Sequence, residues 1–95
     1  MTTIREIQND FKSARKLNKA GQIIEAARAF LAVQQQAARS RSRFAPALAM
    51  DAHCLAATAR VRLDRAGITD HAARSEAGRI ARASAFILHR AEPSK

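Results

Sequence analysis

The residue types that bind metals or act as nucleophiles come together once in this chain, at Asp51, His53 and Cys54. Neighbouring residues of a helix point about 100° apart, so His53 and Cys54 cannot ligate one metal ion together. Asp51 and Cys54 are one turn apart, but two ligands of different kinds do not complete a metal site. We therefore expect Cys54 to behave as a small apolar side chain and predict no metal-binding residue.

Motifs with a known catalytic mechanism are absent from the sequence. It has no glycine-rich phosphate loop, no nucleophile elbow and no pair of carboxylates in an apolar setting. His71 is expected in the first turn of a helix, and His89 near its end, where the helix dipole favours a basic side chain. We predict that the protein is not an enzyme and has no catalytic or cofactor-binding residue.

Basic side chains are the most evident chemical feature. The chain has 17 Lys and Arg against 8 Asp and Glu, a formal net charge of +9. Such an excess favours binding to nucleic acid, to an anionic membrane or to an acidic protein, without choosing among them. Most of these residues are arginines, whose planar guanidinium suits contacts to phosphate or carboxylate.

The basic residues form three groups: a stripe on the N-terminal helix, the segment 39–43, and the C-terminal helix around an aromatic side chain that can stack on bases. The predicted partner- or phosphate-binding residues are Lys12, Arg15, Lys16, Lys19, Arg39, Arg41, Arg43, Arg79, Arg82 and Phe86. Each group also has a simpler interpretation, namely a solvated helix face, a solvated linker, and a dimer contact or core edge for the aromatic residue. A membrane-surface helix is disfavoured because the apolar face of the N-terminal helix lacks Trp and is needed for the core.

Composition predicts that helices carry all of these side chains. The 95 residues include 23 Ala but only 3 Gly and 2 Pro, and Ala loses no side-chain entropy in a helix. Four helices are expected in a single helical domain over residues 1–90, as hairpins 3–40 and 46–90 joined by a basic linker, 39–45. Residues 91–95 are expected to form a disordered tail.

Local signals place the ends and faces of these helices. Thr3 and Glu6 have capping-box spacing, Pro46 reads as the first turn of the third helix, and Thr69 or Asp70 caps the fourth. Residues 34–36 are expected on the solvated side of the second helix. The third helix carries two apolar stripes and is therefore expected to be covered on two sides. The first stripe is Leu48, Ala52, Leu55, Ala59 and Leu63, and the second is Met50, Cys54, Ala57 and Val61.

An internal repeat relates the two hairpins. Lys19-Ala20-Gly21 followed by Ala26-Ala27-Arg28 matches Arg65-Ala66-Gly67 followed by Ala72-Ala73-Arg74, at an offset of 46 residues. The first unit, with a glycine turn, Ala26 and then Phe30, resembles a tetratricopeptide-type helical hairpin. The second unit has Glu76 where the aromatic residue is expected, and its offset exceeds the family's 34 residues. The resemblance implies paired helices, and two such units make a bundle rather than a solenoid.

Together these features predict an all-α fold, a four-helix antiparallel bundle built from two related hairpins. The single cysteine and the charged N-terminus predict a cytoplasmic protein without a membrane span. The predicted function is that of a noncatalytic interaction module, an adaptor or regulator that binds an acidic or helical protein partner. The alternative is a basic accessory protein that binds DNA or RNA through phosphate contacts. Homodimer formation is left open, because an Ala-rich core buries little apolar area.

Overall fold

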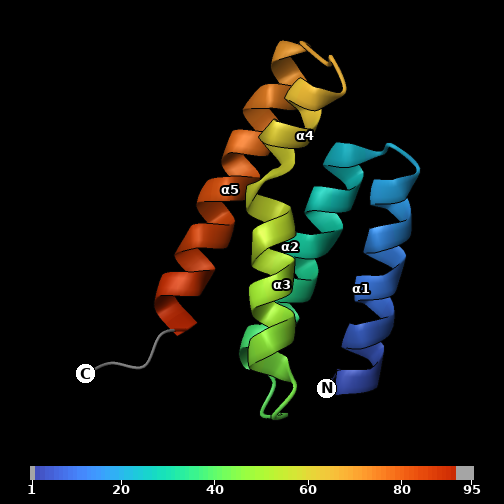
Figure 1. The fold of residues 1–95 in the computed structure, drawn as a ribbon. Helices are drawn as coiled ribbons and strands as arrows, with labels where there is room; N and C mark the ends of the chain where they lie inside the picture. Colours follow the sequence, from blue (N-terminus) through green and yellow to red (C-terminus); the bar gives the residue numbers. More distant parts are fainter. Residues whose placement is uncertain (1, 92–95) are drawn as a thin grey trace.

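The computed structural model describes residues 2–91, and within them every regular element is a helix (Figure 1). The helices are α1 (Ile4–Lys19), α2 (Ile23–Arg39), α3 (Ala45–Ala57), α4 (Ala59–Arg65) and α5 (His71–Ala91). The prediction of an all-α chain is confirmed. The helix expected from residue 46 to residue 65 is divided at Thr58, which gives five helices instead of four. Beyond residue 91 the expected tail lies outside the described residues.

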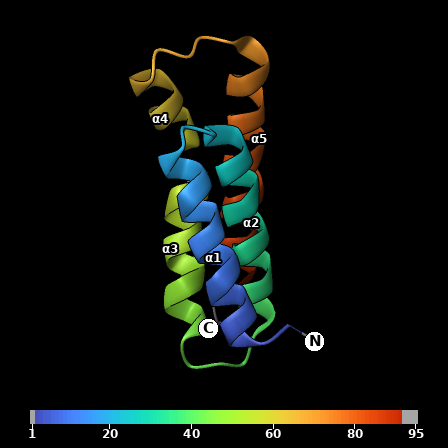
Figure 2. The same cartoon turned by 90° about the vertical axis from the view of Figure 1, so that its right-hand side faces the viewer.

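The helices run up and down around a central pair, α2 and α3. Figures 1 and 2 show α1 on one side of this pair and α5 on the other. Helix α2 approaches all four other helices, whereas no Cα atom of α1 lies within 8 Å of one in α5. The molecule measures 39 × 30 × 18 Å, so it is about two helices thick. The outer helices therefore depend on the central pair and not on each other.

The helix starts follow the predicted caps. Thr3 and Glu6 form the capping box: the Thr3 hydroxyl accepts the Glu6 N–H and the Glu6 carboxylate accepts the Thr3 N–H, both at 3.2 Å. Hydrogen bonds from the Thr3 backbone and side chain hold the pKa of the Glu6 carboxyl below its ordinary value. Pro46 lies in the first turn of α3, and the Asp70 carboxylate accepts the Ala73 N–H at 3.0 Å.

The two glycine turns have the same geometry. Gly21 and Gly67 have φ angles of 83° and 73°, and each follows a helix that ends in a pair of backbone hydrogen bonds. Gly21 N–H donates to the Asn18 carbonyl and Gln22 N–H to the Leu17 carbonyl; Gly67 and Ile68 repeat the pattern with Asp64 and Leu63. This is the Schellman motif, which satisfies the last carbonyls of a helix and needs a left-handed residue after its end.

The core consists of Ala-lined helix faces around a few large side chains. Phe30 is fully buried, and its ring lies 5.5 Å from that of Phe11. The core stripe predicted for the third helix is confirmed, since Ala52, Ala59 and Leu63 are buried. Two predictions about surface are wrong. Gln34 is 1% exposed instead of solvated, because it follows Phe30 by four residues on the buried face of α2. The second stripe is not covered by the described chain: Met50, Cys54 and Val61 are exposed.

The division between α3 and α4 has a side-chain cause. The Thr58 hydroxyl donates to the Cys54 carbonyl at 2.6 Å, a bond from a threonine to the preceding turn that bends helices. Arg62 donates to the Thr58 hydroxyl at 2.8 Å and also to the Leu55 carbonyl. Partial burial lowers the pKa of the Arg62 guanidinium. Arg62 therefore serves the helix junction and is not available to a ligand.

We predict opposite effects of the same substitution at two glycines. Gly67→Ala should lower the free energy of unfolding by about 1–2 kcal/mol, because a Cβ is disfavoured at positive φ. Gly78→Ala should raise it by about 0.5–1 kcal/mol, because Gly78 lies inside α5 and its Cβ would meet only Arg82 Nη1, at 3.6 Å. Urea denaturation of both variants measures the difference. Two shifts of the same sign would contradict the assignment of the turn.

Candidate functional site

Three polar side chains meet inside the molecule, each from a different helix: Gln34 of α2, His53 of α3 and Ser84 of α5. The Gln34 amide Nε2 donates to the Ser84 carbonyl at 2.9 Å, and the Ser84 hydroxyl donates to Gln34 Oε1. The Nδ1 atom of His53 lies 2.7 Å from the Ser84 hydroxyl. Ser84 is 0% exposed. A histidine that accepts the proton of a neighbouring serine hydroxyl makes the serine a nucleophile. Whether this pair can do so therefore depends on which atoms carry the protons.

The hydrogen-bond pattern assigns those protons. A hydroxyl has one hydrogen, and Ser84 gives it to the Gln34 carbonyl oxygen. The bond between His53 and Ser84 then requires a hydrogen on Nδ1 of His53, so this nitrogen is a donor and cannot accept the serine proton. With Ser84 also closed to solvent, the three residues form a structural network that joins α2, α3 and α5. Sequence reasoning missed this network, although the position of Gln34 one turn after Phe30 was a usable signal.

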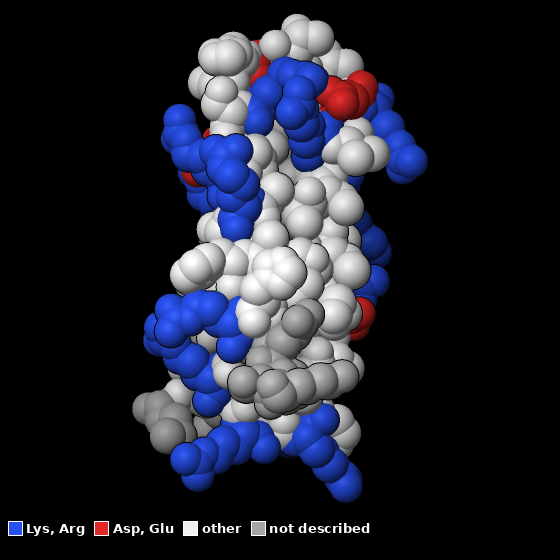
Figure 3. Space-filling model, turned by 90° about the vertical axis from the view of Figure 1, so that its left-hand side faces the viewer, with Lys and Arg blue, Asp and Glu red and all other residues white. Residues whose placement is uncertain are grey.

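The charged residues are spread over several sides of the molecule. Figure 3, which looks at the side of α5, shows Lys and Arg at both ends and along the edges, separated by a strip of uncharged atoms. Only three ion pairs occur among the described residues: Arg28 with Glu76 at 3.0 Å, Arg79 with Glu76 at 3.1 Å, and Arg74 with Asp64. Most basic side chains are therefore unpaired in this part of the chain, and they line separate hollows along α1, beside the α2–α3 segment and between α4 and α5.

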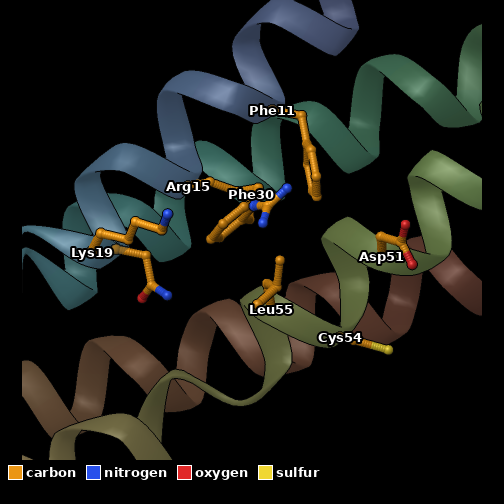
Figure 4. Close-up of a pocket in the computed structure, with 8 residues that line it drawn as sticks. Phe11, Arg15, Lys19, Phe30, Asp51, Cys54 and Leu55 are labelled. Atoms are coloured by element: carbon orange, nitrogen blue, oxygen red, sulfur yellow. The ribbon is translucent and has the colours of Figure 1, made fainter.

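A groove runs between α1 and α3, because α1 packs mainly on α2 and scarcely reaches α3. It consists of two pockets that share Phe11 and Arg15 and is therefore continuous along α1. Figure 4 shows Leu55 pointing from α3 toward Phe30 and Arg15, whereas Cys54 points away. The apolar floor is made by Phe11, Phe30, Leu48 and Leu55.

The rim of this groove is basic. Arg5, Lys12, Arg15 and Lys19 line it from α1, and Asp51 on α3 is the one carboxylate that lines it in the described chain. The Oδ1 atom of Asn18, at the same edge, is buried without a hydrogen-bond partner. Four residues of the predicted basic stripe on this helix thus lie on the groove, while Lys16 is exposed outside it.

The other predicted residues lie elsewhere. Arg39 and Arg41 line a hollow with Thr2 and Gln36, and Arg43 lies over the Phe44 ring at 5.0 Å. Arg79 and Arg82 line a pocket between α4 and α5.

Phe86 is 61% exposed and lies in a different hollow, with Arg90 5.6 Å from its ring centroid. Phe86 thus lines a hollow with the end of α2, whereas Arg79 and Arg82 line the pocket between α4 and α5.

Within residues 2–91 no group of three or more His, Cys, Asp or Glu side chains is placed to hold a metal ion. None of the helices in that range is both long and apolar enough to cross a membrane. Comparisons with protein-family models, with curated proteins and with solved structures gave no match to this chain.

We predict that the buried network stabilises the fold. Ser84→Ala should lower the free energy of unfolding by about 1–3 kcal/mol, because it leaves the buried Gln34 carbonyl without a donor. Ser75→Ala on the same helix is the control and should change it by about 0.5 kcal/mol or less, as its one side-chain contact, to His71, is 3.4 Å long. Both changes gain the same helix propensity, so thermal melts report the hydrogen bonds. Equal melting temperatures would refute the role of the network.

Proposed function

We propose that this chain is a noncatalytic interaction module, an adaptor or regulator, and that its α1–α3 groove binds an acidic amphipathic helix of a partner protein. One observation carries the proposal: the groove combines an apolar floor with a rim of four basic side chains on a single helix. An amphipathic helix binds in this way by laying its apolar face in a hydrophobic groove.

The spacing of the rim supports a helical partner. Arg5, Lys12, Arg15 and Lys19 follow one another at seven, three and four residues, which keeps them on one side of α1. From Arg5 to Lys19 the helix rises by about 21 Å, at 1.5 Å per residue. Carboxylates at the same intervals on a bound helix would face these four cations in turn.

The floor supplies what the charges alone do not. An exposed ion pair contributes about 0–1 kcal/mol, so a basic rim by itself gives weak and salt-sensitive binding. Apolar side chains of the partner placed against Phe11, Leu48 and Leu55 add about 25 cal/mol for each Å² removed from water. The floor thus provides affinity and the rim selects acidic partners and speeds association.

The architecture that supports the groove follows from the repeat. We propose that α1 with α2, and α3 and α4 with α5, are two related hairpins of a four-helix antiparallel bundle, which resemble tetratricopeptide-type units. Their equivalent glycine turns share one hydrogen-bond pattern. The groove lies between the first helices of the two units. Phe30 and Glu76 occupy equivalent positions: Phe30 fills the core of the first unit, whereas Glu76 pairs with Arg28 across the two units.

Nucleic-acid binding is a second candidate, favoured by the segment between α2 and α3. Arg41 and Arg43 are exposed there, and neither forms an ion pair in the described chain. Phosphate contacts release counterions, so binding of this kind weakens steeply with salt. The spread of charge over several sides weighs for the protein partner, because a duplex needs basic residues gathered on one face.

The groove is tested with a labelled acidic amphipathic helical peptide of about 18 residues, or about 27 Å. We predict that Arg15→Glu combined with Lys19→Glu raises its Kd at least tenfold, because both side chains line the groove. Lys16→Glu makes one such charge reversal instead of two, on the same helix but outside the groove, and should alter Kd by less than about twofold. Fluorescence anisotropy measures both. An equal loss in the Lys16 variant, or no binding by the wild type, would count against the proposal.

The second candidate has its own test, the salt dependence of binding to labelled oligonucleotides. If the α2–α3 segment contacts phosphates, replacing Arg39, Arg41 and Arg43 with Ala should reduce the slope of log K against log salt by up to about three contacts. The Arg15/Lys19 variant is the control, since those residues lie on the α1–α3 groove. An unchanged slope in the triple variant would exclude phosphate contact through this segment.

A further inference from the structure

A second basic pocket lies between α4 and α5 and is separate from the α1–α3 groove. It is lined by Arg60, His71, Arg74, Gly78, Arg79 and Arg82. Arg60 comes from α4, and the other five residues come from α5. Of these, His71, Arg74, Gly78 and Arg82 follow one another at three, four and four residues and therefore share one side of the helix, and Arg79 is the neighbour of Gly78. The sequence singled out only Arg79 and Arg82, because the turn between α4 and α5 is what brings Arg60 to them.

Two of the four guanidinium groups of the pocket are held by carboxylates outside it. Arg74 is bonded to Asp64, and Arg79 donates to Glu76 at 3.1 Å. Glu76 is itself fixed, because its other oxygen accepts from Arg28 at 3.0 Å. Arg82 folds back along α5, where its Nη1 lies 3.6 Å from the position that a Cβ of Gly78 would take. The glycine therefore leaves a hollow in the middle of the basic side chains.

The acidic residues do not neutralise this cluster. Around the pocket are five guanidiniums, with Arg28 included, and three carboxylates, those of Asp64, Asp70 and Glu76. Two positive charges remain, and Arg60 and Arg82 form no ion pair in the described chain. His71 is the first residue of α5, so the positive end of the helix dipole adds to the excess.

We propose that the α4–α5 pocket binds a small anion that carries phosphate groups. Arginine presents several N–H donors in a planar fork that matches the oxygens of phosphate. Arg74 and Arg79, which are paired with carboxylates, lose little freedom on binding, and an anion with two or more negative charges offsets the excess charge. This site is independent of the helix-binding groove, as the two share no lining residue.

The probe is inorganic tripolyphosphate, titrated at constant ionic strength and followed by calorimetry and by amide chemical shifts. We expect saturable binding of one anion per chain, with the largest shifts at Gly78 and its neighbours. Arg60→Gln combined with Arg82→Gln should raise Kd at least tenfold. These residues form no ion pair in the described chain, so the melting temperature of this variant should not fall below the wild-type value. Arg90→Gln is the control, because Arg90 lies on the same helix but lines another hollow. It should leave Kd within about twofold of the wild-type value, since a distant exposed charge contributes little to binding.

Two results would overturn the proposal. One is binding that does not saturate, or that falls equally in the Arg90 variant, because this is the behaviour of a diffuse positive field. The other is binding of a single-stranded oligonucleotide that is lost in the Arg60/Arg82 variant, together with no binding of tripolyphosphate. The pocket would then be part of a nucleic-acid surface. A nucleoside triphosphate that binds more tightly than tripolyphosphate, with the same loss in the Arg60/Arg82 variant, would support the site and show that its ligand is a nucleotide.

Discussion

The burial of α2 is the constraint on which the rest of the structure depends. This helix approaches all four of the others, and Ala26, Ala27, Phe30, Val33 and Ala37 are all at most 3% exposed. Alanine side chains let neighbouring helices come close from more than one direction, while Phe30 fills the space that small residues leave. A single helix thus supplies core to both sides of a thin molecule, and α1 has no other partner of comparable extent, whereas α5 also packs on α3.

Each surface feature follows from that arrangement. Because α1 rests on α2 and scarcely touches α3, the two helices leave a groove whose floor is the edge of the core. On the other side, α5 packs on both α2 and α3, and Ser84 carries hydrogen bonds to Gln34 and His53 of those helices. The polar network gives α5 a fixed register, since a shift along its axis would leave buried polar groups unpaired. That register sets where the arginines of α5 stand relative to Arg60.

Sequence reasoning predicted what depends on neighbouring residues and missed what depends on distant ones. The capping box at Thr3, the glycine turns and the first apolar stripe of the third helix each follow from spacing within one helix, and the structure has them. The division at Thr58 was missed because threonine is tolerated within helices, and the junction depends on the bond of Thr58 to Cys54 together with those of Arg62 to Thr58 and Leu55. Gln34 was assigned to the surface by its residue type, although its position in the stripe of α2 required burial.

For the site, sequence identified the basic side chains but not their division among separate hollows, because that division depends on how the helices pack.

The charge balance gives the two proposed surfaces a common physical basis. A chain with a net charge of +9 and few internal ion pairs is destabilised by the mutual repulsion of its cations, and only water and salt weaken that repulsion. Two of the three carboxylate contacts go to Glu76, which ties Arg28 of α2 to Arg79 of α5 and so serves the packing of these helices. Part of the remaining excess lies along the α1–α3 groove and around the α4–α5 pocket. A ligand with negative charge at either place removes repulsion that the folded chain cannot relieve by itself, and by linkage its binding stabilises the fold.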